Sequence, residues 1–316
     1  MHSNFRLSFL LAYILLNIIH VAQTVPSGYL LGSTYIPGAP SNSLCKIDPL
    51  TGKFSTLAAL EDYKAYDVTY DFIHKVFYVF GSRAFINRDT AELSVLVVNP
   101  FNGTQQYRPL PTEPFVNLFG LRVDSSTGEL YTLQMSDVEE DPISIIQIDP
   151  VDFKVKRWVN ITKSTGVQPD SMAIFYNATD HRYFVTVAPE SFDNALVGID
   201  VVRRKEISRI VKHSLPAYLC YDNITNAFYG IQETEGKRGC RLIRLNPYNG
   251  TIEVLSPDFN DYLASTGTCY GGFYFTMIVK NLNTQKIVTF DLANHGKIIA
   301  SNPAESYLDA FAFVPI

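Results

Sequence analysis

Short apolar runs recur along the chain, and each is followed by a polar turn that begins with Asp or Asn. The first example is Ile47-Asp48-Pro49-Leu50-Thr51-Gly52. The turn residue recurs at Asp48, Asn99, Asp149, Asp200, Asn246 and Asp291, with spacings of 51, 50, 51, 46 and 45 residues. A period of this size indicates repeated supersecondary units.

The turn has a simple physical basis. The Asp or Asn side chain accepts hydrogen bonds from the backbone that follows it, Pro fixes φ at the next position, and Gly or Asn adopts the left-handed conformation at little cost. The chain therefore reverses, and the turn is expected to join two antiparallel strands.

Each repeat reads as four short strands, which we call a, b, c and d. In the first complete repeat they are expected at 66–71, 76–80, 93–98 and 104–110, because β-branched and aromatic residues dominate these stretches. The segment 308–314 reads as a strand a with nothing after it, and 28–33 as a strand b with nothing before it. Together they complete one repeat, which predicts a ring closed by the two ends of the chain.

The predicted fold is therefore all-β: a six-bladed β-propeller with four antiparallel strands in each blade. Residues 25–316 are expected to form one domain, with blades at about 66–113, 114–164, 165–214, 215–262, 263–306, and 307–316 plus 28–65.

Two patterns resemble a known class. The segment Phe119-Gly120-Leu121-Arg122-Val123-Asp124, followed by Gly128-Glu129-Leu130-Tyr131, and the apolar-Asp-Pro-x-x-Gly turns are similar to those of secreted six-bladed propellers with YVTN-, NHL- or SMP-30-like repeats. The resemblance covers about residues 28–316. It implies a fold and leaves the activity open, because a propeller hosts many unrelated functions.

The first 24 residues read as a signal peptide, with Arg6 ahead of an apolar stretch and small residues at Ala22 and Thr24. An uncleaved anchor is the alternative. No later stretch is apolar enough to span a bilayer. The mature chain is expected outside the cell or in the lumen of the secretory–endolysosomal pathway. Export agrees with five glycosylation sequons, at Asn102, Asn160, Asn177, Asn223 and Asn249.

Composition narrows the partners further. The chain has 316 residues, 47% hydrophobic and 18% charged, with a net charge of −5 and no long run of either sign. No basic footprint for nucleic acid is present. An extracellular protein or glycan is the expected partner, and a monomer the expected state.

The four cysteines, Cys45, Cys220, Cys240 and Cys269, form no C-x-x-C pair and show no zinc-ligand spacing. Cys220 and Cys269 occupy equivalent points of adjacent repeats and are the first candidates for a disulfide. Buried free thiols are the alternative.

Antiparallel strands place the a–b and c–d turns on one face of the ring and the b–c and d–a loops on the other. Four sequons fall in a–b or c–d turns, and Asn160, near the end of a strand d, is the exception. If sugars crowd the face of the a–b and c–d turns, a ligand is expected on the opposite face, that of the b–c and d–a loops. The alternative is that sequons simply collect in tight turns.

Candidate ligand-binding residues in the b–c loops are Arg83, Arg88, Asp137 and Glu190. The acidic loops could hold Ca2+ or be solvated.

Strand a lines the central channel of such rings, and polar residues are expected near its start. Asp67, Asn117, Asp170 and Asp309 are the candidate metal ligands, with Ca2+ as the one cofactor suggested. A water-filled channel with hydrogen-bonded polar side chains is the alternative. The resemblance implies a lactonase to be tested, with Asn117 and Asp170 nearest to the metal ligands of SMP-30-like lactonases. The longer segment that carries the metal-binding Asn in those enzymes is missing.

Motifs for nucleophilic catalysis are absent, and the histidines read as exposed turn residues. The interpretation is an exported, glycosylated, non-catalytic binding module that acts through its b–c/d–a face. The alternative is a metal-dependent hydrolase of the lactonase or esterase type that uses the channel carboxylates.

Overall fold

The computed structural model describes residues 24–34, 42–83, 92–110, 116–136, 143–161, 169–177, 179–187, 194–212, 215–234, 238–281 and 284–316. Within these ranges we find no helix with the length and hydropathy needed to cross a bilayer. The expected signal peptide lies outside the described residues except for Thr24.

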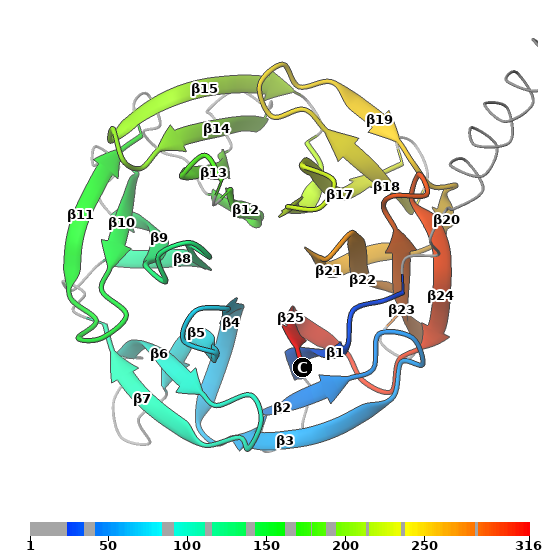
Figure 1. Ribbon diagram of the computed structural model, residues 1–316, viewed down its shortest axis with the longest axis horizontal. Coiled ribbons are helices and arrows are strands. Elements are labelled where there is room, and N and C mark those ends of the chain that lie inside the picture. The colour runs from blue at the N-terminus through cyan, green and yellow to red at the C-terminus, as the bar shows by residue number, and fades with distance from the viewer. Residues whose placement is uncertain are drawn as a thin grey trace, which may run out of the picture.

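Six antiparallel sheets surround a central opening, and the predicted six-bladed β-propeller is confirmed (Figure 1). The innermost strand of each sheet lines the opening, and the outermost strand runs along the rim. The C-terminal strand β25 (Leu308–Pro315) is hydrogen-bonded to β1 (Gly28–Thr34), from Gly28 opposite Pro315 to Thr34 opposite Leu308. One blade is therefore built from both ends of the chain, as predicted.

The remaining strands follow the expected order a, b, c, d. Blade 1 contains β4 (Tyr63–Asp71), β5 (Val76–Arg83), β6 (Glu92–Val98) and β7 (Gln105–Pro109). Blade 2 contains β8 (Val116–Val123), β9 (Leu130–Ser136), β10 (Ser144–Ile148) and β11 (Val155–Asn160). Blade 3 contains β12 (Pro169–Asn177), β13 (Arg182–Val187), β14 (Asn194–Asp200) and β15 (Lys205–Lys212).

The second half of the ring repeats the plan. Blade 4 contains β16 (Ala217–Asp222), β17 (Ala227–Glu233), β18 (Gly239–Leu245), β19 (Ile252–Val254) and β20 (Phe259–Asn260). Its outer edge is split, because both β19 and β20 pair with β18. Blade 5 contains β21 (Leu263–Tyr270), β22 (Phe273–Asn281), β23 (Thr284–Asp291) and β24 (Lys297–Pro303). Blade 6 contains β25, β1, β2 (Asn42–Ile47) and β3 (Phe54–Leu60).

The repeated c–d turn has the geometry that its residues predict. Asp48 Oδ1 accepts a hydrogen bond from the Leu50 amide at 2.8 Å, and Asn99 Oδ1 accepts one from the Phe101 amide at 2.9 Å. Gly52 closes its turn with a φ of 70°, a conformation that costs glycine little. The side-chain hydrogen bond and the left-handed residue together hold adjacent strands in register.

An aromatic residue occupies the second position of every strand b. These residues are Phe77, Tyr131, Tyr183, Phe228, Tyr274 and Tyr29, all buried between neighbouring blades. The Tyr183 hydroxyl donates to the Gly120 carbonyl of blade 2 at 2.8 Å, and the Tyr274 hydroxyl donates to the Tyr218 carbonyl of blade 4 at 2.9 Å. In blades 3 and 5 the tyrosine at this position therefore packs its ring between two blades, and its hydroxyl bonds to the inner strand of the preceding blade.

Candidate functional site

A cavity of about 860 Å3 occupies the centre of the ring. Its wall comes chiefly from the inner strands β4, β8, β16, β21 and β25. This volume is typical of ligand-binding cavities in proteins. The cavity is therefore the candidate functional site, and its chemistry depends on which inner-strand side chains reach it.

Every inner strand departs from regular pairing with its strand b. In β4 the register shifts between Ala65 and Asp67, and in β21 between Ala264 and Thr266. In β25 the partners of Ser33 and Thr34 are Ala310 and Leu308, which leaves Asp309 outside the pairing. The corresponding shifts in β8, β12 and β16 lie between Phe119 and Arg122, Asp170 and Ile174, and Ala217 and Cys220. A bulge redirects side chains, so these irregularities determine which residues face the cavity.

The bulges also correct one expectation. β4 begins at Tyr63 rather than at residue 66. Tyr66 is a bulge, and the pairing with β5 resumes before it, from Ala65 back to Tyr63. Asp67 consequently lies in the middle of its strand, whereas Asn117, Asp170 and Asp309 are each the second residue of theirs. The pairing with strand b nevertheless places Asp67 and Asp170 at equivalent levels, because they lie opposite Phe80 and Thr186, each three residues after the buried aromatic residue of its strand b.

Asp67 is already paired. Its Oδ2 lies 2.5 Å from Nη1 of Arg122 on β8, and its Oδ1 accepts the Val68 amide at 2.8 Å. The two side chains are only 17% and 24% exposed, respectively. Burial raises the pKa of the Asp67 carboxyl, and the Arg122 guanidinium opposes that rise. The charge of this carboxylate is already balanced by the Arg122 guanidinium. Asp67 is therefore poorly suited to hold a divalent cation or to act as a general base.

Asp309 has a different environment. No other side chain lies within hydrogen-bond or ion-pair distance of its carboxylate in the described part of the chain. Burial raises its pKa to about 6, and the positive charge of Lys64 partly offsets that effect. Lys64 lies on the adjacent inner strand β4 and also lines the cavity. Its ammonium nitrogen is 5.4 Å from the centre of the Tyr66 ring.

Tyrosines form much of the remaining polar wall. Tyr66 is 46% exposed, and its hydroxyl is hydrogen-bonded to Ser82 Oγ at 2.8 Å. Tyr218 and Tyr307 also line the cavity. Tyr218 has a positive φ of 52°, which is uncommon for a bulky residue and marks the bulge of β16. Aromatic faces together with hydroxyl groups suit a ligand that has both apolar and polar parts.

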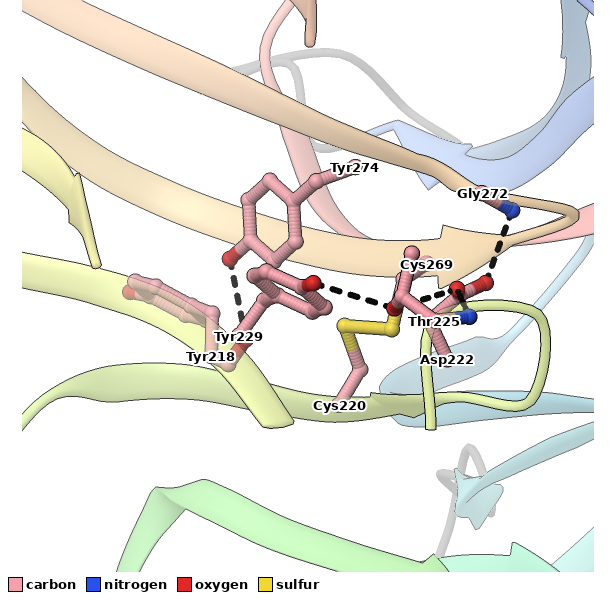
Figure 2. The surroundings of a disulfide bond; sticks show 8 residues. All are labelled: Tyr218, Cys220, Asp222, Thr225, Tyr229, Cys269, Gly272 and Tyr274. Carbon is pink, nitrogen blue, oxygen red and sulfur yellow. Dashed lines mark hydrogen bonds between the residues drawn. A yellow bond between two sulfur atoms is a disulfide. The ribbon is translucent and has the colours of Figure 1, made fainter. Parts of the chain in front are cut away.

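A disulfide connects the inner strands of blades 4 and 5 (Figure 2). It joins Cys220 on β16 to Cys269 on β21, with the Cα atoms 5.8 Å apart. This is the pair considered first from the sequence, while Cys45 and Cys240 are free and buried. Beside the disulfide, Asp222 Oδ1 accepts the Gly272 amide of blade 5 at 2.8 Å. The junction is thus fixed by a covalent bond and by hydrogen bonds on both sides of it.

The other metal-site candidates are placed only by their backbone. Asn117 and Asp170 lie on neighbouring inner strands, β8 and β12, and their side chains are outside the described set. Among the described residues no group of three or more His, Cys, Asp or Glu side chains could hold a metal ion. The described carboxylates alone do not form a metal centre.

Most of the ligand candidates from the b–c loops lie outside the described residues, namely Arg88, Asp137 and Glu190. Arg83 is described, at the end of β5. Its guanidinium packs over the Tyr107 ring of the same blade, 5.4 Å from the ring centre. Arg83 therefore belongs to the outer part of blade 1 and does not line the cavity.

The sequons differ in exposure. Asn102, Asn160, Asn223 and Asn249 are exposed, whereas Asn177 is only 2% exposed. Asn177 Oδ1 accepts the Thr179 amide at 3.0 Å, and its Nδ2 donates to Asp180 at 3.3 Å. A sugar on Asn177 would have to displace these contacts.

Two histidines are less free than the sequence suggested. His74 and His181 lie in a–b turns as expected, but each contacts a buried carboxylate, at 2.6 Å from Asp71 and 3.2 Å from Asp124. The His181 contact crosses from blade 3 to blade 2. In each turn aspartate, Oδ1 accepts a hydrogen bond from the turn itself, and Oδ2 lies against the histidine ring. The histidine is held there because a buried carboxylate oxygen needs a hydrogen-bond donor.

Sequence reasoning named Tyr218 as a polar residue of the channel but missed Lys64, Arg122, Tyr66 and Tyr307. Arg122 belongs to the segment that identified the fold and was not considered as part of a site. Lys64 precedes the expected strand at 66–71, and Tyr66 is its first residue. The bulge at Tyr66 interrupts the alternation of inward and outward side chains there. An Asp on one inner strand with an Arg on the next was the available signal for the ion pair.

Comparison with known proteins identifies the fold alone. No protein-family model matches the chain, and no curated protein matches its sequence. A chain of the nidogen/laminin complex is similar in structure, with 12% identity and a TM-score of 0.62 over 91% of this chain and 98% of that chain. TolB from Acinetobacter baumannii has 11% identity and a TM-score of 0.65, over 92% of this chain and 67% of that one. A candidate 6-phosphogluconolactonase from Bacteroides uniformis has 13% identity and a TM-score of 0.58, over 92% and 100%.

Proposed function

We propose that this chain is an exported, glycosylated, non-catalytic binding module. Its ligand approaches from the b–c/d–a face and reaches the mouth of the central cavity. The observation that carries this proposal is the state of the cavity carboxylates. Asp67 is neutralised by Arg122, while Asp309 and the tyrosines beside it are left to contact a ligand.

The structural neighbours are compatible with this role. One of them comes from a complex between nidogen and laminin, so a propeller of this architecture occurs in a protein–protein complex. For this chain an extracellular protein or glycan is the proposed partner, and a monomer the proposed state. At this level of identity the neighbour shows the fold alone and identifies no partner.

A metal-dependent hydrolase of the lactonase or esterase type is the second candidate. The observation in its favour is that Asn117, Asp170 and Asp309 each occupy the second position of an inner strand, and therefore lie at the same end of the ring. One neighbour is a candidate lactonase. The ligands would be oxygen atoms, as Ca2+ prefers.

One experiment separates the two candidates. Metal content is measured on the purified chain, and its melting temperature is compared in EDTA and in excess Ca2+. A binding module is expected to contain no stoichiometric metal and to melt at the same temperature in both. A bound metal with a large Ca2+-dependent rise in melting temperature, together with lactone or ester hydrolysis that Asp170→Ala abolishes, would establish the hydrolase instead.

Export and glycosylation have their own test. The full chain is expressed in a secretory cell, and the mature N-terminus and the mass before and after enzymatic deglycosylation are determined. Cleavage near residue 24 and sugars on the exposed sequons are expected. A chain that stays in the cell without sugars would contradict this part of the proposal.

A further inference from the structure

The mouth of the cavity contains two opposite charges that are not paired with each other. Lys64 on β4 and Asp309 on β25 both line the cavity on adjacent inner strands. Both are described residues, and no ion pair within 4.0 Å joins them. They are nevertheless close enough for the charge of Lys64 to lower the pKa of Asp309. The space between them is wider than a salt bridge.

We propose that this mouth binds a zwitterion of the α-amino-acid type, whose carboxylate meets Lys64 and whose ammonium meets Asp309. The proposal rests on the binding role proposed above and names the ligand class for the same cavity. It goes beyond that role because it assigns a separate function to each of the two residues.

Charge arguments favour a zwitterion over simpler ions. A simple cation would pair with Asp309 but would be repelled by Lys64, and a simple anion would meet the reverse problem. A neutral ligand would leave both charges uncompensated as it displaced their water. A ligand that carries both charges a short distance apart satisfies both residues with charge-assisted hydrogen bonds.

The surrounding wall favours an apolar side chain on that ligand. Tyr66 presents an exposed ring beside Lys64, and Tyr307 lies two residues before Asp309 and also lines the cavity. Aromatic rings supply contact area at little cost in conformational entropy. Because burial places the Asp309 pKa at about 6, the carboxylate is largely ionised at pH 7.5.

Three probes of nearly the same shape test the proposal by calorimetry at pH 7.5. L-Phenylalanine carries both charges, phenethylamine lacks the carboxylate, and 3-phenylpropanoate lacks the ammonium. We expect phenylalanine to bind at least about tenfold more tightly than either analogue, since each analogue loses one charge-assisted contact.

Variants assign the two contacts. In Asp309→Asn the preference for phenylalanine over 3-phenylpropanoate should fall to about twofold or less, because the ammonium has lost its partner. In Lys64→Gln the preference over phenethylamine should disappear in the same way. The matched controls are Asp62→Asn and Lys53→Gln, which change the same charges at exposed positions outside the cavity wall and should keep both preferences.

Three results would overturn the proposal: equal affinity for the three probes, no binding of phenylalanine at about 10 mM, or preferences that persist in both cavity variants. Melting curves of each variant show whether it is folded, so a loss of binding is not confused with a loss of structure. Failure here without a bound metal would leave the binding role intact with another ligand class. A functional metal with hydrolysis would remove both proposals.

Discussion

Two junctions between neighbouring inner strands perform the same structural task with different chemistry. Blades 4 and 5 are joined by the Cys220–Cys269 disulfide, and blades 1 and 2 by the Asp67–Arg122 ion pair. The disulfide is insensitive to pH and salt, whereas the ion pair depends on the protonation of a largely buried carboxylate. Asp67, Arg122 and Cys220 are also residues of the cavity wall. Among the residues that the structure describes, the junction between blades 6 and 1 has neither a disulfide nor an ion pair, and there Lys64 and Asp309 stay available to a ligand.

The largest expected effect comes from removing the strand that closes the ring at the blade 6–1 junction. Deletion of residues 308–316 removes β25 and exposes apolar residues of both neighbouring blades, since Leu308 and Phe311 pack against blade 5 and Val314 packs against blade 1. We expect the truncated chain to lose cooperative folding. Thermal melting followed by circular dichroism tests this, and a cooperative, native-like melt would show that the ring does not need β25 to close it.

The next largest effect is expected at the covalent junction. The double variant Cys220→Ala/Cys269→Ala opens a loop between positions 49 residues apart. Loss of the bond should lower the free energy of unfolding by about 2–4 kcal/mol, which corresponds to roughly 4–10 °C in melting temperature. Wild-type protein in a strong reductant is the matched control and should melt near the variant. Unchanged melting in both would mean that the junction does not need the bond.

A smaller effect is expected at the ionic junction. Arg122→Met leaves Asp67 without its partner, so the free energy of unfolding at pH 7.5 should fall by about 1–3 kcal/mol. Without Arg122, the folded-state pKa of Asp67 should rise further above its unfolded value. The loss should therefore shrink as the pH falls through that raised pKa and the carboxyl becomes neutral. Denaturant unfolding at pH 4.5 and 7.5 measures the difference.

The double variant Arg122→Met/Asp67→Asn removes both charges and should recover part of the loss at pH 7.5. A double variant that is less stable than the single one would show that the charges stabilise the junction beyond mutual neutralisation.

The smallest effect, with the opposite sign, is expected at the blade 6–1 junction. Asp309 has a folded-state pKa of about 6, above its ordinary value of 3.8, so the fold favours the protonated form. Stability from this group is fully present below its unfolded pKa and is lost as the pH rises through about 6. Because Asp309 is partly exposed, solvent screening reduces this effect. Asp309→Asn should thus stabilise the protein at pH 7.5 by about 1–2 kcal/mol, and have little effect at pH 4.

Melting temperatures at the two pH values test this prediction, with Asp62→Asn as an exposed control that should change neither. A destabilising effect of Asp309→Asn at pH 7.5 would mean that the carboxylate has a stabilising partner, and the contrast with the other two junctions would disappear.

The architecture was predictable because its signals are local. Asp48 and Asn99 mark equivalent turns, and their hydrogen bonds to the following backbone involve residues two positions away. The spacing of such turns predicts the number of blades, and the apolar segments at 28–33 and 308–314 predict the closure. Interactions this short in sequence leave a pattern that can be read directly.

The candidate site was predictable only in part. Asp67 and Asp309 were selected as residues of the channel wall, and both line the cavity. Their different states depend on Arg122, 55 residues away from Asp67, and on Lys64, which lies on the strand beside Asp309. Neither relation leaves a signal in the local alternation of apolar and polar residues.

The sequence by itself thus determined the repeat, the turn chemistry and the closure of the ring, because each depends on backbone preferences and short-range hydrogen bonds. The tertiary structure alone decided which inner-strand residues face the cavity and which charges are paired there. The reason is the bulge in each inner strand. A shift of one residue reverses the side of the strand on which a side chain lies, and only the packing of neighbouring blades fixes where that shift occurs.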